Sequence, residues 1–569
     1  MSVPDFPLRE LAIRIWKAGV RAVDAETLVQ NQILVEGDSL TIAGHRLEIG
    51  EVGRLCVLGA GKAGAGMAAG VESKLAGTPW EERLSGWVNV PEDCVRPLAR
   101  IHLHAARPAG VNEPTLAGVE GAEEILRLAS SLRPNDVCIV LISGGGSALL
   151  PAPVNGVTLE DKLAATRFLS GAGATIQELN ALRKAISGIK GGGLARACTA
   201  GSLIALIISD VIGDPLEVIA SGPTVATPID VNLAVEVLRK FDPERSKIAE
   251  AIHNRVAEFL AKPVMDASIG CHVENHVIGN NALAIHACAE EARAAGIDDV
   301  RIVGVDQAGV ASDIGRRIAR DCRVLRDSFS EPLATSRLTC LLSGGEPVVS
   351  LARTDQPRKG GRNQELVLAA VCELWSIVDG LNVATIEKVC ELLAPSGFKI
   401  TRERLKLVEE VFALTQGFDE EQLVAQLKTS PGGRRVSPGS IERVLPLLVE
   451  AGVLRLRLRE DGREIYEHTG ADGIAILSGG TDGEDGPTDA AGAVLDDELL
   501  QRAKSLGLDP ADFLVINNSY PFFEQCGSLL KTGPTHTNVM DVRVALVQHR
   551  RADGILEERQ EGIEKSAAP

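Results

Sequence analysis

The fold is decided by the stretch Cys138-Ile139-Val140-Leu141-Ile142-Ser143-Gly144-Gly145-Gly146-Ser147, an apolar run that ends in a glycine-rich turn. Two more apolar runs end in the same tripeptide, at Ser343-Gly344-Gly345 and Ser478-Gly479-Gly480. Each pattern predicts a buried strand that stops where glycine allows positive φ and lets backbone N–H groups approach a ligand. Three such strand ends indicate an α/β enzyme that holds a phosphorylated ligand above its sheet.

Strand-like and helical patterns alternate around this stretch. Strands are predicted at Leu55–Leu58, 136–142 and Ser202–Ser209, and helical patterns lie between them. This alternation predicts a parallel, doubly wound, Rossmann-like sheet. A second α/β unit is predicted from about residue 270, where a strand-like run over Val273–Gly279 leads into a helix.

The glycine-rich turns stop near residue 376 and resume after Gly470. The sequence between them predicts helices and then two short strands, at Glu387–Leu393, Arg402–Leu414, Glu420–Leu427, Ser440–Glu450, Leu454–Arg459 and Glu464–His468. Helices followed by a β-hairpin are the outline of a winged helix-turn-helix. The predicted domains are an N-terminal Rossmann-like domain (1–265), a discontinuous C-terminal α/β domain (266–375 and 470–548), the inserted winged helix (376–469) and a charged tail (549–569).

Composition argues against a protein that coats nucleic acid, is held by disulfides or spans a membrane. The 569 residues carry a formal net charge of −18, which argues against a protein that coats nucleic acid. The 11 cysteines form no C-x-x-C pair and most lie in apolar runs, so we expect buried free thiols in a reducing cytoplasm. No run approaches the ~20 uncharged residues of a membrane span. The amphipathic N-terminus predicts neither a signal peptide nor an anchor.

The loop after the first predicted strand reads Gly59-Ala60-Gly61-Lys62-Ala63-Gly64. Its G-x-G-x-x-G spacing is that of a dinucleotide-binding turn, but no clear strand ending in an acidic residue follows about twenty residues later. A cation at Lys62, beside backbone N–H groups, suits an anionic substrate or a transferring phosphoryl group. Spacing alone leaves a solvated lysine on a tight turn as an equal alternative.

Further segments of the first unit offer ligands for an anion. The turn Ser143–Ser147, with its backbone N–H groups and two hydroxyls, can hold phosphates although the chain has no Walker A sequence. Lys190 precedes a glycine triplet, a setting that an exposed surface position does not readily explain. Arg183, by contrast, is explained by a position on the surface of a predicted helix. Asp210 and Asp214 follow a predicted strand at its carboxyl end, where the ligands of α/β proteins bind.

Charged side chains also mark the second α/β unit. Arg362 stands at a predicted helix start, where it can hold a phosphate or carboxylate through two hydrogen bonds. The segment from Ser478 to Asp489 places four acidic residues among glycines. Its oxygen-rich, sulfur-free composition suits Mg²⁺, and an acidic turn without a metal is the alternative.

Together and in this order, the motifs resemble those of the class II glycerate kinases, whose C-terminal part is called the MOFRL domain. The matching stretches are Gly59–Ala63, Ser143–Leu149, Asn180–Gly193, Ile208–Thr224, Ser343–Glu346, Gly360–Leu366, Ser478–Ala493 and Asn517–Asp541. The resemblance implies a two-domain fold with the active site in the cleft between the domains. It also implies transfer of the γ-phosphate of ATP to D-glycerate, mostly giving 2-phosphoglycerate, with Mg²⁺.

The resemblance also assigns roles to residues. Lys62, Arg362 and Asp210 are the expected catalytic residues, because phosphoryl transfer needs convergent cations and a positioned substrate. The nucleotide phosphates are expected at Ser143, Gly144, Gly145, Gly146, Ser147, Lys190, Ser478, Gly479, Gly480 and Thr481. Mg²⁺ is expected at Asp214, Asp482 and Asp485.

The insert has a resemblance of its own, to the winged-helix half of ferric uptake regulator proteins. The similar segments are Ile400–Leu405, Phe418–Leu423, Val436–Gly452 and Asp461–His468. In that family Ser440–Leu448 would be the recognition helix. Glu442 stands where the family usually has a base-contacting tyrosine, and residues 385–468 hold 13 basic and 14 acidic side chains. Nucleic-acid binding through this segment is therefore less favoured than a regulatory or protein-interaction role.

Two alternatives to the kinase stay open at this point. The glycine-rich loop around Lys62 also fits an NAD(P)-dependent reductase that acts on hydroxypyruvate or tartronate semialdehyde. The second alternative is a DNA-binding regulator that uses the insert and senses a ligand through its α/β domains. The sequence also leaves open whether the chain forms a homo-oligomer and whether the insert regulates the cleft.

Overall fold

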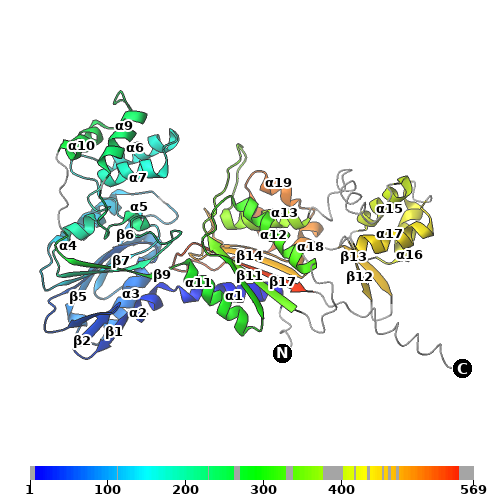
Figure 1. The fold of residues 1–569 in the computed structure, drawn as a ribbon, viewed down its shortest axis with the longest axis horizontal. Helices are drawn as coiled ribbons and strands as arrows, with labels where there is room; N and C mark the ends of the chain where they lie inside the picture. The colour runs from blue at the N-terminus through cyan, green and yellow to red at the C-terminus, as the bar shows by residue number, and fades with distance from the viewer. Residues whose placement is uncertain are drawn as a thin grey trace.

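Two six-stranded sheets and a smaller lobe dominate the fold (Figure 1). The computed structural model describes residues 7–111, 113–228, 230–261, 269–327, 337–375, 401–414, 418–431, 436–450, 454–458, 463–468 and 473–549. Within these residues, no helix has the length and apolar character needed to cross a bilayer. The ten cysteines among them are free and nine are buried, as the composition predicts.

The first sheet is wholly parallel, as predicted. Its strands lie in the order β6 (Ile101–Arg107), β5 (Leu84–Pro91), β4 (Leu55–Ala60), β7 (Val137–Ile142), β8 (Ser202–Ile208) and β9 (His272–Gly279). Numbered along the chain, this is the order 3-2-1-4-5-6 of doubly wound folds. The chain leaves β4 and β7 toward opposite faces of the sheet, which creates a crevice at the carboxyl ends of these two neighbouring strands.

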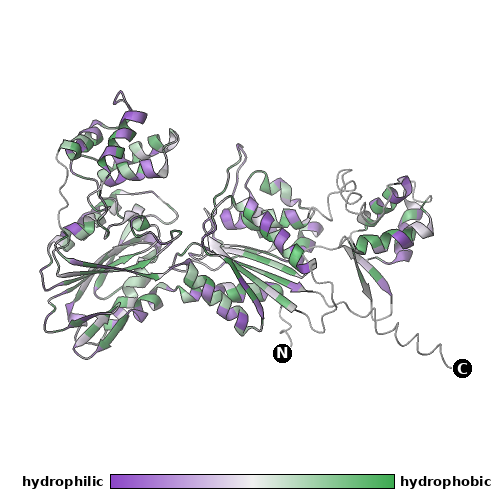
Figure 2. Ribbon diagram, in the orientation of Figure 1, coloured by the Kyte–Doolittle hydropathy of each residue, from purple (hydrophilic) through white to green (hydrophobic). Residues whose placement is uncertain are grey.

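Helices cover both faces of this sheet. α2 (Ala25–Asn31) and α3 (Gly64–Leu75) lie on one face, and α4 (Leu116–Ser130), α5 (Gly146–Leu149) and α8 (Gly193–Ala197) lie on the other. Leu55 and Val57 of β4 face the first group, while Cys56 and Leu58 face the second. Figure 2 shows strands that are mostly hydrophobic and helices that are banded, the pattern of helices packed by one face. A small antiparallel sheet follows α2 and comprises β1 (Ile33–Glu36), β2 (Ser39–Ile42) and β3 (His45–Glu48).

Four helices form a cap above α5 (Figure 1). They are α6 (Leu159–Gly171), α7 (Ile176–Ala185), α9 (Val231–Phe241) and α10 (Glu250–Ala261). Their inward side chains form a hydrophobic cluster of their own, which includes Leu169, Leu182 and Val237. Thr158 and Thr175 begin α6 and α7 with capping boxes, which fix where these helices start.

The second sheet is mixed. Its strands lie in the order β10 (Asp299–Gly304), β11 (Arg337–Gly345), β17 (Asp541–His549), β14 (Ile474–Gly480), β15 (Gly492–Leu495) and β16 (Leu529–Leu530). β10 and β11 are parallel, and the other neighbouring pairs are antiparallel. Arg543 of β17 pairs with both Ser343 and Ser478. The second and third Ser-Gly-Gly turns therefore lie on either side of one strand.

Helices also cover both faces of the second sheet (Figure 1). α12 (Ala311–Asp327) and α13 (Arg362–Trp375) lie on one face and α1 (Leu8–Ala22) and α11 (Asn281–Ala294) on the other, while α18 (Asp497–Ser505), α19 (Pro510–Leu514) and α20 (Ser519–Cys526) follow β15. Leu341 of β11 packs with α12 and α13, and the next residue, Leu342, packs with α1 and α11. This alternation is what a strand buried on both faces requires.

Two elements depart from the domain boundary predicted between residues 265 and 266. β9 pairs in parallel with β8 and so belongs to the first sheet. α1 packs across the second sheet, where the Trp16 indole donates a hydrogen bond to the carbonyl of Gly479 at 3.3 Å. A strand-and-helix pattern specifies neither the sheet that a strand joins nor the face that a helix covers, because long-range pairing decides both.

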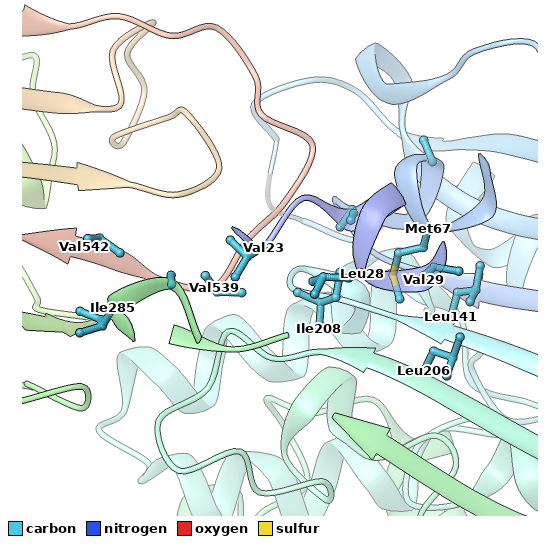
Figure 3. Close-up of a cluster of buried hydrophobic side chains, with 14 of the residues drawn as sticks. Val23, Leu28, Val29, Met67, Leu141, Leu206, Ile208, Ile285, Val539 and Val542 are labelled. Carbon is cyan, nitrogen blue, oxygen red and sulfur yellow. The ribbon is translucent and has the colours of Figure 1, made fainter. Parts of the chain in front are cut away.

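One hydrophobic cluster runs from the first sheet to the second (Figure 3). Leu141 and Ile208 belong to the first sheet and Val542 to the second, and Leu28 and Val539 lie between them. All five side chains are at most 5% exposed. The two sheets are therefore packed together as one body.

The smaller lobe consists of three helices followed by an antiparallel hairpin. Its elements are α15 (Arg402–Ala413), α16 (Glu420–Thr429), α17 (Pro438–Glu450), β12 (Leu454–Leu458) and β13 (Glu464–His468). An antiparallel bridge joins Phe418 to Tyr466, and a separate core includes Leu423 and Leu448. The described helices and hairpin appear in the predicted order. The helix predicted at Glu387–Leu393 and nearly all of the predicted tail lie outside the described residues.

Candidate active site

A cleft of about 1140 Å³ opens between the two sheets. Lys62 and Arg107 line it from the first sheet, and Arg362, Asp482 and Asp485 line it from the second. The structure thus brings the two expected catalytic cations to one cavity although they are distant in sequence.

Lys62 is held at the crevice between β4 and β7 by contacts between the two loops. Gly61 has φ +153° and lies directly against the Ser143 hydroxyl, so a side chain there has no room. The Lys62 N–H donates to the carbonyl of Gly144 at 2.9 Å, and the Ala63 N–H donates to Ser143 Oγ at 3.0 Å. Ser143 is fully buried, so its hydroxyl positions the Lys62 loop.

The Lys62 ammonium reaches across the cleft to two carboxylates. Its Nζ lies 3.0 Å from Asp482 Oδ2 and 3.3 Å from Glu484 Oε2. Burial alone would lower the pKa of Lys62, but the charges and hydrogen bonds of these two acids outweigh it and raise the pKa. Lys62 therefore stays protonated and links the first sheet to the acidic loop after β14.

Arg362, the first residue of α13, is fixed by two carboxylates. Its Nε and Nη2 donate to Asp541 at 2.8 and 3.0 Å, and its Nη1 donates to Glu346 at 2.6 Å. Burial alone would lower the pKa of Arg362, but the charge of Asp541 and its hydrogen bonds, together with the charge of Glu346, raise it. Because Asp541 is itself fully buried, the guanidinium keeps one orientation at the cleft wall.

Asp485 anchors the start of α13. Its two carboxylate oxygens accept the backbone N–H groups of Asn363 at 3.0 Å and Gln364 at 2.8 Å. Burial raises the pKa of Asp485 to about 7, against the lowering effect of these N–H groups. Asp485 therefore positions the turn that carries Arg362.

Asp210 follows the end of β8 and is not among the residues that line the cleft, although the charges of Lys62 and Asp482 act on it. Its Oδ2 accepts a hydrogen bond from Asn538 Nδ2 at 3.2 Å and lies against Gly144, where a side chain would collide with it. Burial, followed by the charge of Glu346, raises the pKa of Asp210 to about 6. Asp214 is engaged elsewhere, since it accepts a hydrogen bond from Asn280 Nδ2 at 2.7 Å.

The three acids expected to hold Mg²⁺ therefore have different partners. Within the described part of the chain, no three Asp, Glu, His or Cys side chains are grouped as metal ligands. Asp482 and Glu484 nevertheless converge on a single cation, the Lys62 ammonium. Two carboxylates completed by phosphate oxygens are a usual set of Mg²⁺ ligands. The donor set thus fits Mg²⁺ with Glu484 in place of Asp214 and Asp485.

The first Ser-Gly-Gly turn continues into α5 and carries a hydroxyl with a cationic partner. Gly145, the N-cap of α5, has φ +76°, a conformation that favours glycine. Lys190 Nζ donates to Ser147 Oγ at 2.6 Å, and Ser147 Oγ lies 3.1 Å from Ser221 Oγ. The structure therefore brings Lys190 and Ser147 together, as part of the expected phosphate site.

The third Ser-Gly-Gly turn is engaged in packing. The hydroxyl of Ser478 donates to Asn363 Oδ1 at 2.5 Å, and that of Thr481 donates to the carbonyl of Met540 at 2.7 Å. Both residues are fully buried, and Gly479 lies against the Trp16 ring. Residues 478–481 thus support the loop that carries Asp482 and do not line the cleft.

Two carboxylates of the site are absent from the predicted set. Glu484 contacts Lys62, and Asp541 orients Arg362. Both lie inside the stretches that carry the family resemblance, so the motifs themselves were the signal that could have found them. Their partners, Lys62 and Arg362, lie 422 and 179 residues earlier in the chain, and the motifs do not specify such pairings.

The fold and the cleft define a two-domain α/β enzyme whose domains each contribute a cation to one cavity. Residues 11–257 match a domain of unknown function (DUF4147), and residues 454–541 match the MOFRL family. A glycerate kinase from Danio rerio is 33% identical over 563 residues, which cover 95% of this chain and 98% of the relative. A putative hydroxypyruvate reductase from Agrobacterium vitis is 31% identical over 549 residues, which cover 96% of each chain.

A solved structure agrees with these similarities. The crystal structure of a glycerate kinase from Thermotoga maritima superposes with a TM-score of 0.64 at 26% identity, covering 95% of this chain and 99% of that one. The chain belongs to the glycerate kinase family.

Proposed function

We propose that the protein is an ATP-dependent glycerate 2-kinase that converts D-glycerate to 2-phosphoglycerate with Mg²⁺. The observation that carries the proposal is the cleft in which Lys62 and Arg362 face one space from two sheets. The glycerate kinases among the relatives, which align along nearly the whole chain, support the substrate. Their names do not distinguish carbon 2 from carbon 3, so the position of transfer rests on the resemblance to class II enzymes.

The side chains of the cleft supply what phosphoryl transfer needs. The glycerate hydroxyl oxygen bonds to the γ-phosphorus while the bond to the β–γ bridging oxygen breaks and ADP leaves. Lys62 and Arg362 stabilise the charge that spreads over the transferring group. Asp210 accepts the hydroxyl proton, and its pKa of about 6 leaves it ionised near neutral pH. Asp482 and Glu484 would hold Mg²⁺, which when bound neutralises charge on the phosphates.

The test is an enolase-coupled assay with ATP and D-glycerate. A direct signal identifies 2-phosphoglycerate, whereas a signal that needs added phosphoglycerate mutase identifies the 3-isomer. Lys62→Met and Arg362→Met should each lower kcat by about 10²–10³-fold, because each removes one stabilising cation. The control is Arg46→Gln, which removes a cation from an exposed pair with Glu48. Turnover like that of the wild type in both cleft variants would refute the assignment.

A second candidate is an NAD(P)-dependent hydroxypyruvate reductase. The name of the Agrobacterium vitis relative and the Gly59–Gly64 loop at the switch point of a Rossmann-order sheet favour it. Against it, β5 itself ends in Asn89-Val90-Pro91, and acidic residues follow only in the next short helix, η2 (Glu92–Cys94), and not at the strand end where a dinucleotide ribose is held. NADH oxidation with hydroxypyruvate, in the absence of an ATP-dependent product, would decide for the reductase.

We infer that the insert is a winged helix related to the ferric uptake regulators. The order of its described elements supports this, as do the terminal hairpin and the bridge from Phe418, between α15 and α16, to Tyr466 of β13. Glu442 is exposed on α17 and would repel phosphate, so we favour a protein-binding role, with any regulation exerted through the bound partner, over DNA binding. Gel shifts at physiological salt test the DNA-binding alternative.

Buried free cysteines support a cytoplasmic location for the protein. Sedimentation tests whether the chain forms a homo-oligomer.

A further inference from the structure

Three cations of the helical cap and of the loop before α8 lie close enough for their charges to interact. They are Lys162 on α6, Arg183 near the end of α7 and Lys190 in the loop before α8. Lys162 and Lys190 are only 9% and 5% exposed, and Arg183 is half-buried. In the parts of the chain that the structure describes, none of the three forms an ion pair with a carboxylate. Burying positive charge without a counter-charge is costly, so this cluster calls for an anion.

The hydrogen-bonding capacity of the cluster is also unfilled. Lys162 Nζ and Ser187 Oγ are buried without a partner. Lys190 Nζ has one partner, the hydroxyl of Ser147 at 2.6 Å, which leaves two of its three N–H bonds available. Each of these groups can donate to oxygen, and an ammonium has no acceptor, so an acceptor-rich ligand satisfies them.

The three charges act on one another. Burial, and then the charge of Arg183, lowers the pKa of Lys162 to about 8. Burial, and then Arg183 and Lys162, lowers the pKa of Lys190. Burial also lowers the pKa of Arg183. A single carboxylate would balance one of these charges, whereas a chain of phosphates carries enough charge to balance all three.

The cluster lies next to the catalytic crevice. Ser147 belongs to α5, and the N-cap of that helix, Gly145, lies against the side chain of Lys62. Lys190 is therefore connected to Lys62 through Ser147 and Gly145, two residues apart at the start of α5. Figure 1 shows α6 and α7 of the cap above α5.

We propose that Lys162, Arg183 and Lys190, with the hydroxyls of Ser147 and Ser187, form the polyphosphate site of the nucleotide donor. The inner phosphates lie beneath the cap, and the terminal phosphoryl group extends past α5 to Lys62. The cap thereby becomes part of the nucleotide site, and the second sheet, with Arg362, serves the acceptor side of the cleft. This inference rests on the proposed kinase function.

The experiment measures metal-free tripolyphosphate binding to the full chain by calorimetry, together with the KM for ATP and for D-glycerate. The variants are Lys162→Met and Lys190→Met, and the control is Arg167→Gln, an exposed residue of α6 that pairs with Glu113. Each lysine variant should weaken tripolyphosphate binding and raise the KM for ATP by at least about tenfold, as loss of a charged hydrogen bond does. The KM for glycerate should change less than about twofold.

A stability measurement guards against variants that merely fail to fold. Because each substitution removes an uncompensated buried charge, the unliganded variants should melt no lower than the wild type. Tripolyphosphate should raise the melting temperature of the wild type and of Arg167→Gln but not of the lysine variants.

The outcomes separate this inference from the kinase proposal. Unchanged tripolyphosphate binding in both lysine variants, or a rise confined to the KM for glycerate, overturns the polyphosphate site while kinase turnover stands. A wild type that binds tripolyphosphate through these lysines but makes no ADP from ATP and glycerate overturns the kinase proposal instead. In that case the cluster binds an anion for another reaction, and the proposal that it holds the nucleotide donor is refuted together with the kinase proposal.

Discussion

Asp210 takes the proton in the proposed reaction, so its ionisation should set the lower pH limit of activity. Burial raises its pKa to about 6. A base must be ionised to act, so kcat should be level above about pH 7 and fall about tenfold per pH unit below about pH 6. A pH–rate profile checks this. Asp210→Asn should have a low kcat and a pH–rate profile without this inflection, whereas Asp214→Asn should keep the inflection. If the inflection persists in Asp210→Asn, Asp210 is not the base.

Asp485 should matter for both stability and rate, because it holds the first turn of the helix that carries Arg362. Asp485→Ala frees two buried backbone N–H groups and should lower the free energy of unfolding by about 1–2 kcal/mol. It should also lower kcat, since Arg362 loses its fixed position. Denaturant unfolding and steady-state kinetics measure the two effects.

The matched control for Asp485 is Thr115→Ala, which removes the side-chain cap of α4 at 3.1 Å. It should cost similar stability without changing kcat. Equal kinetics in the two variants would mean that Asp485 acts as an ordinary helix cap and does not position Arg362.

The residues of the site were partly predictable from sequence. Lys62, Arg362 and Asp482 stand at strand or helix ends, and such ends gather at one edge of a sheet, so motifs find them. Glu484 and Asp541 were missed because their roles depend on partners from distant segments. Ser478 and Thr481 were assigned to phosphate because a glycine-rich turn looks the same whether it faces a ligand or packs inside a sheet.

At the scale of elements, the insert should fold and function separately from the two sheets. Its described helices pack on one another and on their own hairpin, around a core of their own. Replacing residues 376–469 with a short flexible linker should therefore change kcat and both KM values by less than about twofold. The coupled assay tests this. A larger change would make the insert a regulator of the cleft, and the residues 401–468 expressed alone should still unfold cooperatively by circular dichroism.

The elements themselves were easier to predict than their placement. Short apolar runs predicted β4, β7 and β8, and charged, helix-forming sequence predicted the helices of the insert. The same patterns could not show that β9 joins the first sheet or that α1 crosses to the second. Lys162 was missed for a related reason, because the cap that buries it is positioned by contacts of α6 and α7 and not by any motif.

At the scale of the whole molecule, the two sheets should melt together. One cluster of buried side chains is continuous between them, and Leu28 of α2 lies in it against the end of β9 (Figure 3). Differential scanning calorimetry of the full chain should show one transition for this body and another for the insert. Leu28→Ala should destabilise the first by about 2–5 kcal/mol and leave the second in place. Separate transitions for the two sheets would show that the shared cluster does not couple them.

The position of β17 has a consequence for synthesis on the ribosome. This strand, Asp541–His549, is central in the second sheet, yet it follows every other described strand along the chain. At ~5–20 residues per second, the roughly 200 residues between β11 and β17 take about 10–40 s to emerge, during which β11 has no partner on that side. The nascent second sheet should therefore need a chaperone's protection until β17 has emerged. The insert, which needs nothing from β17, can already be folded by then.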